Sequence, residues 1–128
     1  MATILLVDDE QDMVELLAFN LQEQGHSIVT AAAGSEALEK VREFSPDLIL
    51  LDLLLPDLDG ISICEILRLQ AATREIPIIM ITALSGEITR WTALDAGVND
   101  YLRKPFSPRE LVKRVDYTLL RHQSRNRL

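Results

Sequence analysis

The 128-residue sequence has only one cysteine, Cys64, and two histidines. A single cysteine cannot form a disulfide within the chain, and no Cys and His residues have the spacing of a zinc site. Long apolar runs are also missing. Residues 4–7 are too short for a signal peptide and have no basic leader, and no segment approaches the roughly 18 apolar residues of a membrane span. We therefore expect a cytoplasmic protein without a membrane segment.

Basic residues are in the minority, with 13 lysines and arginines against 20 aspartates and glutamates. Proteins that bind nucleic acid need a basic surface, so direct contact of this acidic chain with nucleic acid is not expected. A DNA-binding domain elsewhere in a longer protein is compatible with this balance. The content of 48% hydrophobic and 26% charged residues is typical of a folded globular domain, and the length suits one domain.

Short apolar segments alternate with segments of helical spacing along the chain. The apolar segments are residues 3–7, 26–31, 47–51, 77–82 and 100–102. Between them apolar residues recur every three or four positions, as at Val14, Leu17 and Leu21, which indicates amphipathic helices. Five alternations predict parallel strands with helices on both faces of the sheet. We expect residues 1–121 to form this domain and residues 122–128 to be a frayed helix end or the start of a linker.

Several single residues have simple structural interpretations. Ser107 is followed directly by Pro108 and, three positions after the serine, by Glu110. This is the pattern of a capping box and predicts the start of the last helix. Asp57 and Asp59 flank a turn and are interpreted as turn residues. Cys64 and Trp91 lie in predicted helices, where packing in the core is favoured over a redox role for Cys64 and over a partner contact for Trp91.

Polar and charged residues stand where four of the predicted strands end. Asp8 and Asp9 follow the first strand, and Asp52 follows the third. Thr82 stands at the end of the fourth strand, and Lys104 follows the fifth. Open parallel α/β sheets bind ligands at the carboxyl ends of their strands. One such residue alone would be read as a loop or cap residue, but five at corresponding positions favour a functional site.

These residue types together point to phosphoryl chemistry. Clustered carboxylates repel one another, and a divalent cation compensates their charge; oxygen ligands of this kind suit Mg²⁺, which is often completed by a phosphate. A carboxylate beside the ion can attack a phosphoryl group as a nucleophile. The Lys104 ammonium and the Thr82 hydroxyl can contact the phosphoryl oxygens, where charge develops. The pattern predicts an aspartyl-phosphate site.

Four blocks of sequence, VDDE, PDLILLDLLLPDLDG, ITA and DYLRKPFSPREL, occur in this order between residues 3 and 120. In order and spacing they resemble the receiver domain of bacterial two-component response regulators. The resemblance implies a flavodoxin-like, doubly wound sheet of five parallel strands in the order 2-1-3-4-5, with five helices on its two faces. It also implies a signalling phosphoacceptor rather than an enzyme that acts on other substrates, with a sensor histidine kinase as partner.

Position by position, the resemblance implies a role for each residue of the site. Asp52 would be the phosphoacceptor. Lys104 would bind the phosphoryl group and precede a cis peptide bond to Pro105. The expected cofactor is Mg²⁺, and its ligands would be Asp8, Asp9, Asp52 and the backbone carbonyl of Leu54.

The resemblance also implies a route by which the signal leaves the site. Thr82 and Tyr101 would form a switch pair that changes the surface of the fourth helix, fifth strand and fifth helix. Charges of both signs on this surface suit a twofold contact, so we expect homodimerisation on phosphorylation. Whether an effector domain follows Leu128 is left open by the sequence. The residues expected at this interface are Arg90, Asp95, Asp100, Glu110, Arg114 and Arg121.

Three other functions share part of the pattern. A metal-dependent phosphatase of the haloacid-dehalogenase type would carry an acid two residues after its aspartyl nucleophile, where this chain has Leu54. A flavin-binding module would have a Ser/Thr-rich loop after the first strand, where this chain has DDEQD. A receiver-fold interaction module that is not phosphorylated would lack some of the five site residues. The phosphatase and the interaction module remain the alternatives to a phosphoacceptor.

Overall fold

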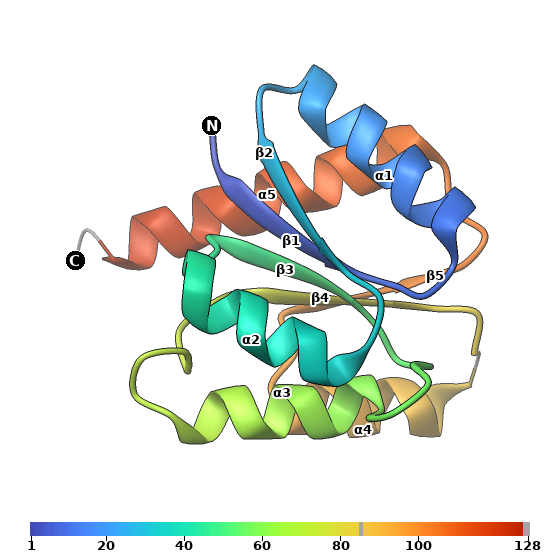
Figure 1. The fold of residues 1–128 in the computed structure, drawn as a ribbon, viewed down its shortest axis with the longest axis vertical. Coiled ribbons are helices and arrows are strands. Elements are labelled where there is room, and N and C mark those ends of the chain that lie inside the picture. The colour runs from blue at the N-terminus through green and yellow to red at the C-terminus, as the bar shows by residue number, and fades with distance from the viewer. Residues whose placement is uncertain (85, 127–128) are drawn as a thin grey trace.

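The computed structural model describes residues 1–84 and 86–126 of the chain. These residues form five strands that alternate with five helices (Figure 1). No helix in this part of the chain is long and apolar enough to cross a bilayer. The elements in chain order are β1 (Thr3–Val7), α1 (Gln11–Glu23), β2 (Ser27–Ala31), α2 (Gly34–Phe44), β3 (Leu48–Asp52), α3 (Gly60–Leu69), β4 (Ile78–Thr82), α4 (Glu87–Ala96), β5 (Asp100–Arg103) and α5 (Pro108–Asn126).

The five strands form one parallel sheet in the order β2-β1-β3-β4-β5. In this register Asp52 lies beside Ile81, and Thr82 lies beside Arg103. The carboxyl ends of β1, β3, β4 and β5 therefore meet at one edge of the sheet. The predicted flavodoxin-like fold and its strand order are confirmed.

The helices α1 and α5 cover one face of the sheet, and α2, α3 and α4 cover the other (Figure 1). Leu17 and Leu21 of α1 pack with Leu111 and Val115 of α5 in one buried cluster. The other cluster contains residues of α2, α3 and α4. The helices α1, α2, α3 and α5 bury apolar residues against the sheet at the spacing that the sequence predicts.

The two strands nearest the site, β3 and β4, are buried along their whole length. Side chains alternate between the faces, so Leu50 belongs to the cluster below α1 and α5 while Leu51 belongs to the opposite one. Burying such a side chain contributes about 1.5–3 kcal/mol, which fixes the strand positions firmly. The polar residues that end these strands are buried as well: Asp52 is 4% exposed and Thr82 is 0% exposed.

Outside the site, one residue differs from its predicted position. Trp91 was expected in the core but is 64% exposed. The buried residue of α4 is Ala93, and residues two positions apart on a helix point in nearly opposite directions, so the packing hypothesis for Trp91 is wrong. Cys64 is buried in α3, as predicted. The predicted tail begins as helix, because α5 continues to Asn126.

Candidate functional site

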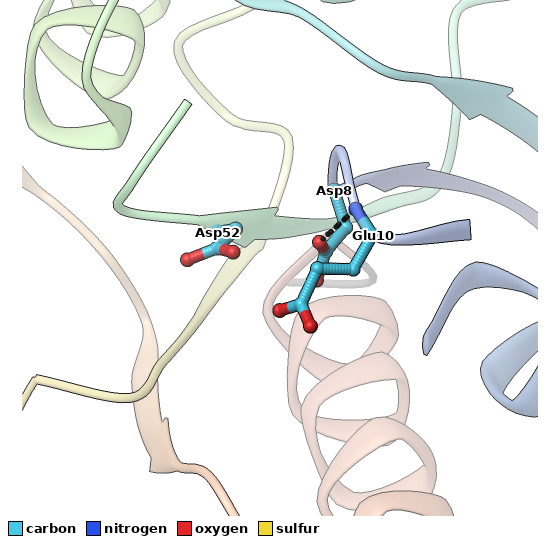
Figure 2. Close-up of side chains that lie close together, drawn as sticks. All are labelled: Asp8, Glu10 and Asp52. Atoms are coloured by element: carbon cyan, nitrogen blue, oxygen red, sulfur yellow. Dashed lines mark hydrogen bonds between the residues drawn. The ribbon is translucent and has the colours of Figure 1, made fainter. Parts of the chain in front are cut away.

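Asp8, Asp52, Thr82 and Lys104 reach the same edge of the sheet from four different strands. The Lys104 Nζ atom lies 2.9 Å from Asp8 Oδ2 and 3.2 Å from Asp52 Oδ2. It also lies 3.1 Å from Glu10 Oε1. Figure 2 shows Asp8 and Glu10 on the turn after β1, with Asp52 at the end of β3. Of the carboxylates predicted to converge, Asp8 and Asp52 contact Lys104, and Glu10 joins them.

The buried polar side chains of the site are held by backbone amides in a common way. Asp8 Oδ1 accepts a hydrogen bond at 2.9 Å from the amide two residues further along the chain. Asp52 Oδ1 accepts one from Leu54 N at 3.1 Å, and Thr82 Oγ1 accepts one from Leu84 N at 3.2 Å. Side chains of this kind often bind the backbone two residues on. These bonds fix one oxygen of each carboxylate and leave the other directed at Lys104.

Burial and charge act against each other at the site. Burial raises the pKa of the Asp52 carboxyl above its ordinary value, and the Leu54 amide and the Lys104 charge only partly offset this effect. Burial alone would lower the pKa of Lys104, but its hydrogen bond to Asp8 and the charges of Asp52 and Asp8 outweigh burial and raise it. The ammonium is therefore held in its charged form among acids that need a cation.

Three carboxylates are close enough to share a metal ion. One oxygen each from Asp8, Glu10 and Asp52 lies within 4.8 Å of the others, and such oxygen donors fit Mg²⁺. Asp9 is exposed and lies outside this group. The chain bends at Asp9, and the hydrogen bond from Glu10 N to Asp8 Oδ1 closes this turn, so Glu10 lies beside Asp8. Leu54, whose backbone carbonyl is predicted to be a metal ligand, lies in the loop after β3.

Thr82 and Tyr101 meet through the backbone of Leu84. The Thr82 hydroxyl accepts a hydrogen bond from Leu84 N, whereas the Tyr101 hydroxyl donates one to the Leu84 carbonyl at 3.0 Å. Thr82 is fully buried and Tyr101 is half-buried. The hydroxyls of Thr82 and Tyr101 are thus linked through the backbone of a single residue.

Comparison with known proteins agrees with this geometry. The sequence profile of the family described as response regulator receiver domain matches residues 4–116. The chain belongs to this family. It is 47% identical over 120 residues to the alkaline phosphatase synthesis transcriptional regulatory protein PhoP of Bacillus subtilis, a match that covers 94% of this chain and 49% of that protein. This receiver domain thus spans about half the length of that relative.

Solved receiver domains have the same fold. The receiver domain of the Francisella response regulator 1452 superimposes with a TM-score of 0.88 at 34% identity, covering 94% of this chain and 98% of that one. The BeF₃-activated N-terminal receiver domain of Klebsiella pneumoniae RstA gives a TM-score of 0.83 at 31% identity, covering 91% and 97% of the two chains. Both likenesses cover nearly the whole receiver domain.

On the predicted interface, the receiver domain pairs three charges within its own chain. Arg114 Nη1 lies 2.9 Å from both carboxylate oxygens of Asp100, and Arg114 Nη2 lies 3.4 Å from Glu110. Arg90 lines a cavity of about 450 Å³ together with Tyr101, Glu110 and Arg114. The two remaining predicted residues, Asp95 and Arg121, are exposed and do not line this cavity.

Asp57 and Asp59, in the loop after the predicted phosphoacceptor, were interpreted as turn residues, but each accepts hydrogen bonds at the start of a helix. Asp59 caps α3, because its Oδ1 accepts a hydrogen bond from Ser62 N at 2.8 Å. Asp57 instead accepts hydrogen bonds from Gly34 N and Ser35 N at the start of α2. Its position before a helix N-terminus could have identified Asp59 as a cap, but no sequence pattern joins Asp57 to a helix 22 residues earlier.

Local predictions around the end of β5 are confirmed. The peptide bond from Lys104 to Pro105 is cis. Ser107 Oγ accepts a hydrogen bond from Glu110 N at 3.1 Å, as expected of the residue before α5. The receiver domain thus begins its last helix where the capping pattern indicated.

Proposed function

We propose that this receiver domain accepts a phosphoryl group on Asp52 from a sensor histidine kinase in a reaction that requires Mg²⁺. The observation that carries the proposal is the buried Asp52 carboxylate with Lys104 Nζ at 3.2 Å and two further acids beside it. Buried acids of this kind are unfavourable unless a cation compensates them. The proposed metal ligands are Asp8, Asp9, Asp52 and the backbone carbonyl of Leu54.

The residues around Asp52 divide the work of the transfer. Asp52 Oδ1 is held by the Leu54 amide, so Oδ2 is the oxygen that forms the new P–O bond while the P–N bond to the donor histidine breaks. The Lys104 ammonium beside Oδ2 stabilises the charge on the phosphoryl oxygens. The Thr82 hydroxyl donates to another of these oxygens. When bound, Mg²⁺ supplies positive charge that offsets the acids and the phosphate.

Phosphorylation would reach the surface through Leu84. When the Thr82 hydroxyl turns to the phosphoryl group, Leu84 N loses its acceptor, and the loop that holds the Tyr101 hydroxyl rearranges. Tyr101 lines the cavity between α4, β5 and α5 together with Arg90 and Arg114. We infer that this rearrangement favours a twofold contact between two copies through α4, β5 and α5, because a surface with charges of both signs can be self-complementary.

We infer a role in the control of transcription from the similarity to PhoP of Bacillus subtilis. That protein is a transcriptional regulatory protein about twice as long as the matched region, which supports an effector domain after Leu128; we propose a cytoplasmic setting for the whole protein. The effector, rather than this domain with its net charge of −7, would then contact DNA.

A mass spectrum after incubation with acetyl phosphate tests the phosphoacceptor. We expect one added phosphoryl group that persists, that requires Mg²⁺ and that is absent from the Asp52→Asn variant. Steady release of phosphate without a lasting adduct would favour a phosphatase. No adduct, even with Mg²⁺ and the cognate kinase, would favour an interaction module that is not phosphorylated.

A further inference from the structure

The loop of residues 53–59, between β3 and α3, is tied to its own neighbours at both ends. Beside β3, Leu54 N donates to Asp52 Oδ1 at 3.1 Å, and Gly60 N donates to the Leu53 carbonyl at 2.9 Å. Beside α3, Asp59 caps the helix. These bonds close the loop locally, but they do not fix its middle against the rest of the molecule.

Asp57 joins the middle of this loop to a different element. Its Oδ1 accepts a hydrogen bond from Gly34 N at 2.7 Å, and its Oδ2 accepts one from Ser35 N at 2.9 Å. Oδ1 also accepts one from Leu58 N at 2.8 Å. The amides at the start of a helix have no acceptor within the helix, and a carboxylate there also meets the positive end of the helix dipole. Asp57 therefore supplies acceptors that α2 lacks.

The loop lies in direct contact with the first residue of α2. A Cβ atom built on Gly34 would lie 2.7 Å from Leu58 Cβ and 3.2 Å from Asp57 Oδ1, so only glycine permits this approach. The hydrogen bonds from Ser35 and Gly34 hold the pKa of the Asp57 carboxyl far below its usual range. The carboxylate is therefore ionised at neutral pH.

We propose that Asp57 is a positioning residue that holds the loop of residues 53–59 against α2, so that the Leu54 carbonyl stays in place for a Mg²⁺ ion bound by Asp8 and Asp52. This inference rests on the proposed function. Mg²⁺ demands near-ideal octahedral geometry with ligands at about 2.0–2.1 Å. A loop freed from α2 must be ordered when the ion binds, which costs entropy. Mutation of a residue that holds a metal ligand in place commonly lowers the metal affinity by about 10–100-fold.

Titration calorimetry of Mg²⁺ binding to the unphosphorylated protein tests the inference. Asp57→Ala is expected to raise the Mg²⁺ Kd about tenfold, and Asp57→Asn, which keeps one acceptor oxygen, is expected to raise it less. The matched control is Glu36→Ala. Glu36 accepts a hydrogen bond from Ala32 N at 2.7 Å near the start of α2, so its loss removes one negative charge and one bond there without touching the loop. The control should leave the Kd within about twofold of wild type.

A second measurement separates positioning from general stability. The rate of labelling by acetyl phosphate is followed against Mg²⁺ concentration for wild type and both Asp57 variants. The half-saturating Mg²⁺ concentration should rise in the variants, whereas the maximal rate should stay near that of wild type. A role limited to stability would lower the thermal midpoint without moving half-saturation.

The two proposals fail in different ways. If wild type binds Mg²⁺ and is labelled but Asp57→Ala has the same Kd as Glu36→Ala, the positioning role is wrong and the proposed function stands. If wild type neither binds Mg²⁺ nor becomes labelled, the proposed function itself is overturned.

Discussion

Two groups of ion pairs in this domain have the same chemistry in opposite surroundings. The Lys104 side chain is 9% exposed, and it contacts the side chains of Asp8 and Asp52, which are 0% and 6% exposed. The Arg114 side chain is 37% exposed and contacts Asp100, which is 26% exposed. Both cations lie about 3 Å from their acids. Burial is therefore the main difference between them.

That difference separates a site for chemistry from a surface for exchange. A buried charge left without its partner is strongly unfavourable, so Asp8 and Asp52 depend on the Lys104 ammonium. A partly exposed pair such as Arg114 and Asp100 contributes less, because water reaches and solvates either partner. We therefore expect the acids around Lys104 to bind a cation beside a phosphoryl group, and we expect Arg114 to exchange Asp100 for an acid on another molecule at small cost in free energy.

The largest expected effect comes from removing the two cations in turn. Lys104→Met leaves Asp8 and Asp52 buried without their ammonium and should lower the free energy of unfolding by about 3 kcal/mol. Arg114→Met should change it by less than about 1 kcal/mol. Urea unfolding followed by circular dichroism in EDTA measures both. Mg²⁺ should stabilise the Lys104 variant more than the Arg114 variant, because only in the former does it replace a missing positive charge beside the same acids. Equal losses would show that burial does not separate the two groups.

The second effect concerns water at the buried site. Leu54 and Leu84 stand two residues after Asp52 and Thr82 and are 52% and 39% exposed. Apolar side chains at the border of the site hinder an attacking water and give it no hydrogen bond for alignment. We expect slow loss of the phosphoryl group, faster by about tenfold or more when both leucines become asparagine. Mass spectra of the decaying adduct give the rate. A wild type as fast as the double variant would exclude this role of the leucines.

The buried group was largely predictable from sequence because strand burial leaves a clear pattern. The apolar runs of β3 and β4 end at Asp52 and Thr82, and parallel strands bring such ends together. One member of the acid group was not predicted. Glu10 joins Asp8 and Asp52 in that group, and the bend at Asp9 together with the hydrogen bond from Glu10 N to Asp8 Oδ1 places it there. The path of such a turn cannot be assigned from the spacing of apolar residues.

Contacts between distant segments were not predictable at all. Asp57 binds amides at the start of α2, and the choice of this partner depends on how α2 packs beside α3. The core position predicted for Trp91 was wrong because the apolar residues of the short helix α4 do not form one clear stripe, so the buried side of this helix could not be assigned from their spacing. Propensity and periodicity act along the chain, whereas these contacts are set by packing across it.

The third effect is a pH dependence that the buried acid alone should show. Burial raises the pKa of Asp52, so the folded protein binds this proton more tightly than the unfolded chain does. The contribution of this carboxyl to stability is then greatest in acid and is lost as the pH rises through the folded pKa. Asp52→Asn should therefore stabilise the protein at pH 7, and the gain should shrink toward the ordinary Asp pKa of about 4.

Thermal midpoints between pH 4 and pH 8 test this dependence. Asp100→Asn is the matched change in the exposed group, and it should alter the midpoint little at any pH in this range. A destabilised Asp52→Asn variant at pH 7 would mean that the attraction of Lys104 outweighs the cost of burying the acid.

The smallest effect on folding is expected at Arg114, where the consequence should appear in assembly instead. Arg114→Glu places a third acid beside Asp100 and Glu110 and should lower the free energy of unfolding by no more than about 1 kcal/mol. Like charges facing each other across a twofold contact are repeated by symmetry, so the same change should abolish a dimer formed through α4, β5 and α5. Sedimentation with and without beryllofluoride, a phosphoryl mimic, measures this. Arg109→Glu makes the same charge change on α5 beside the groove next to α1 and should leave the dimer intact. A mimic-induced dimer that survives Arg114→Glu, or a monomer that ignores the mimic, would place the output of this domain on another surface.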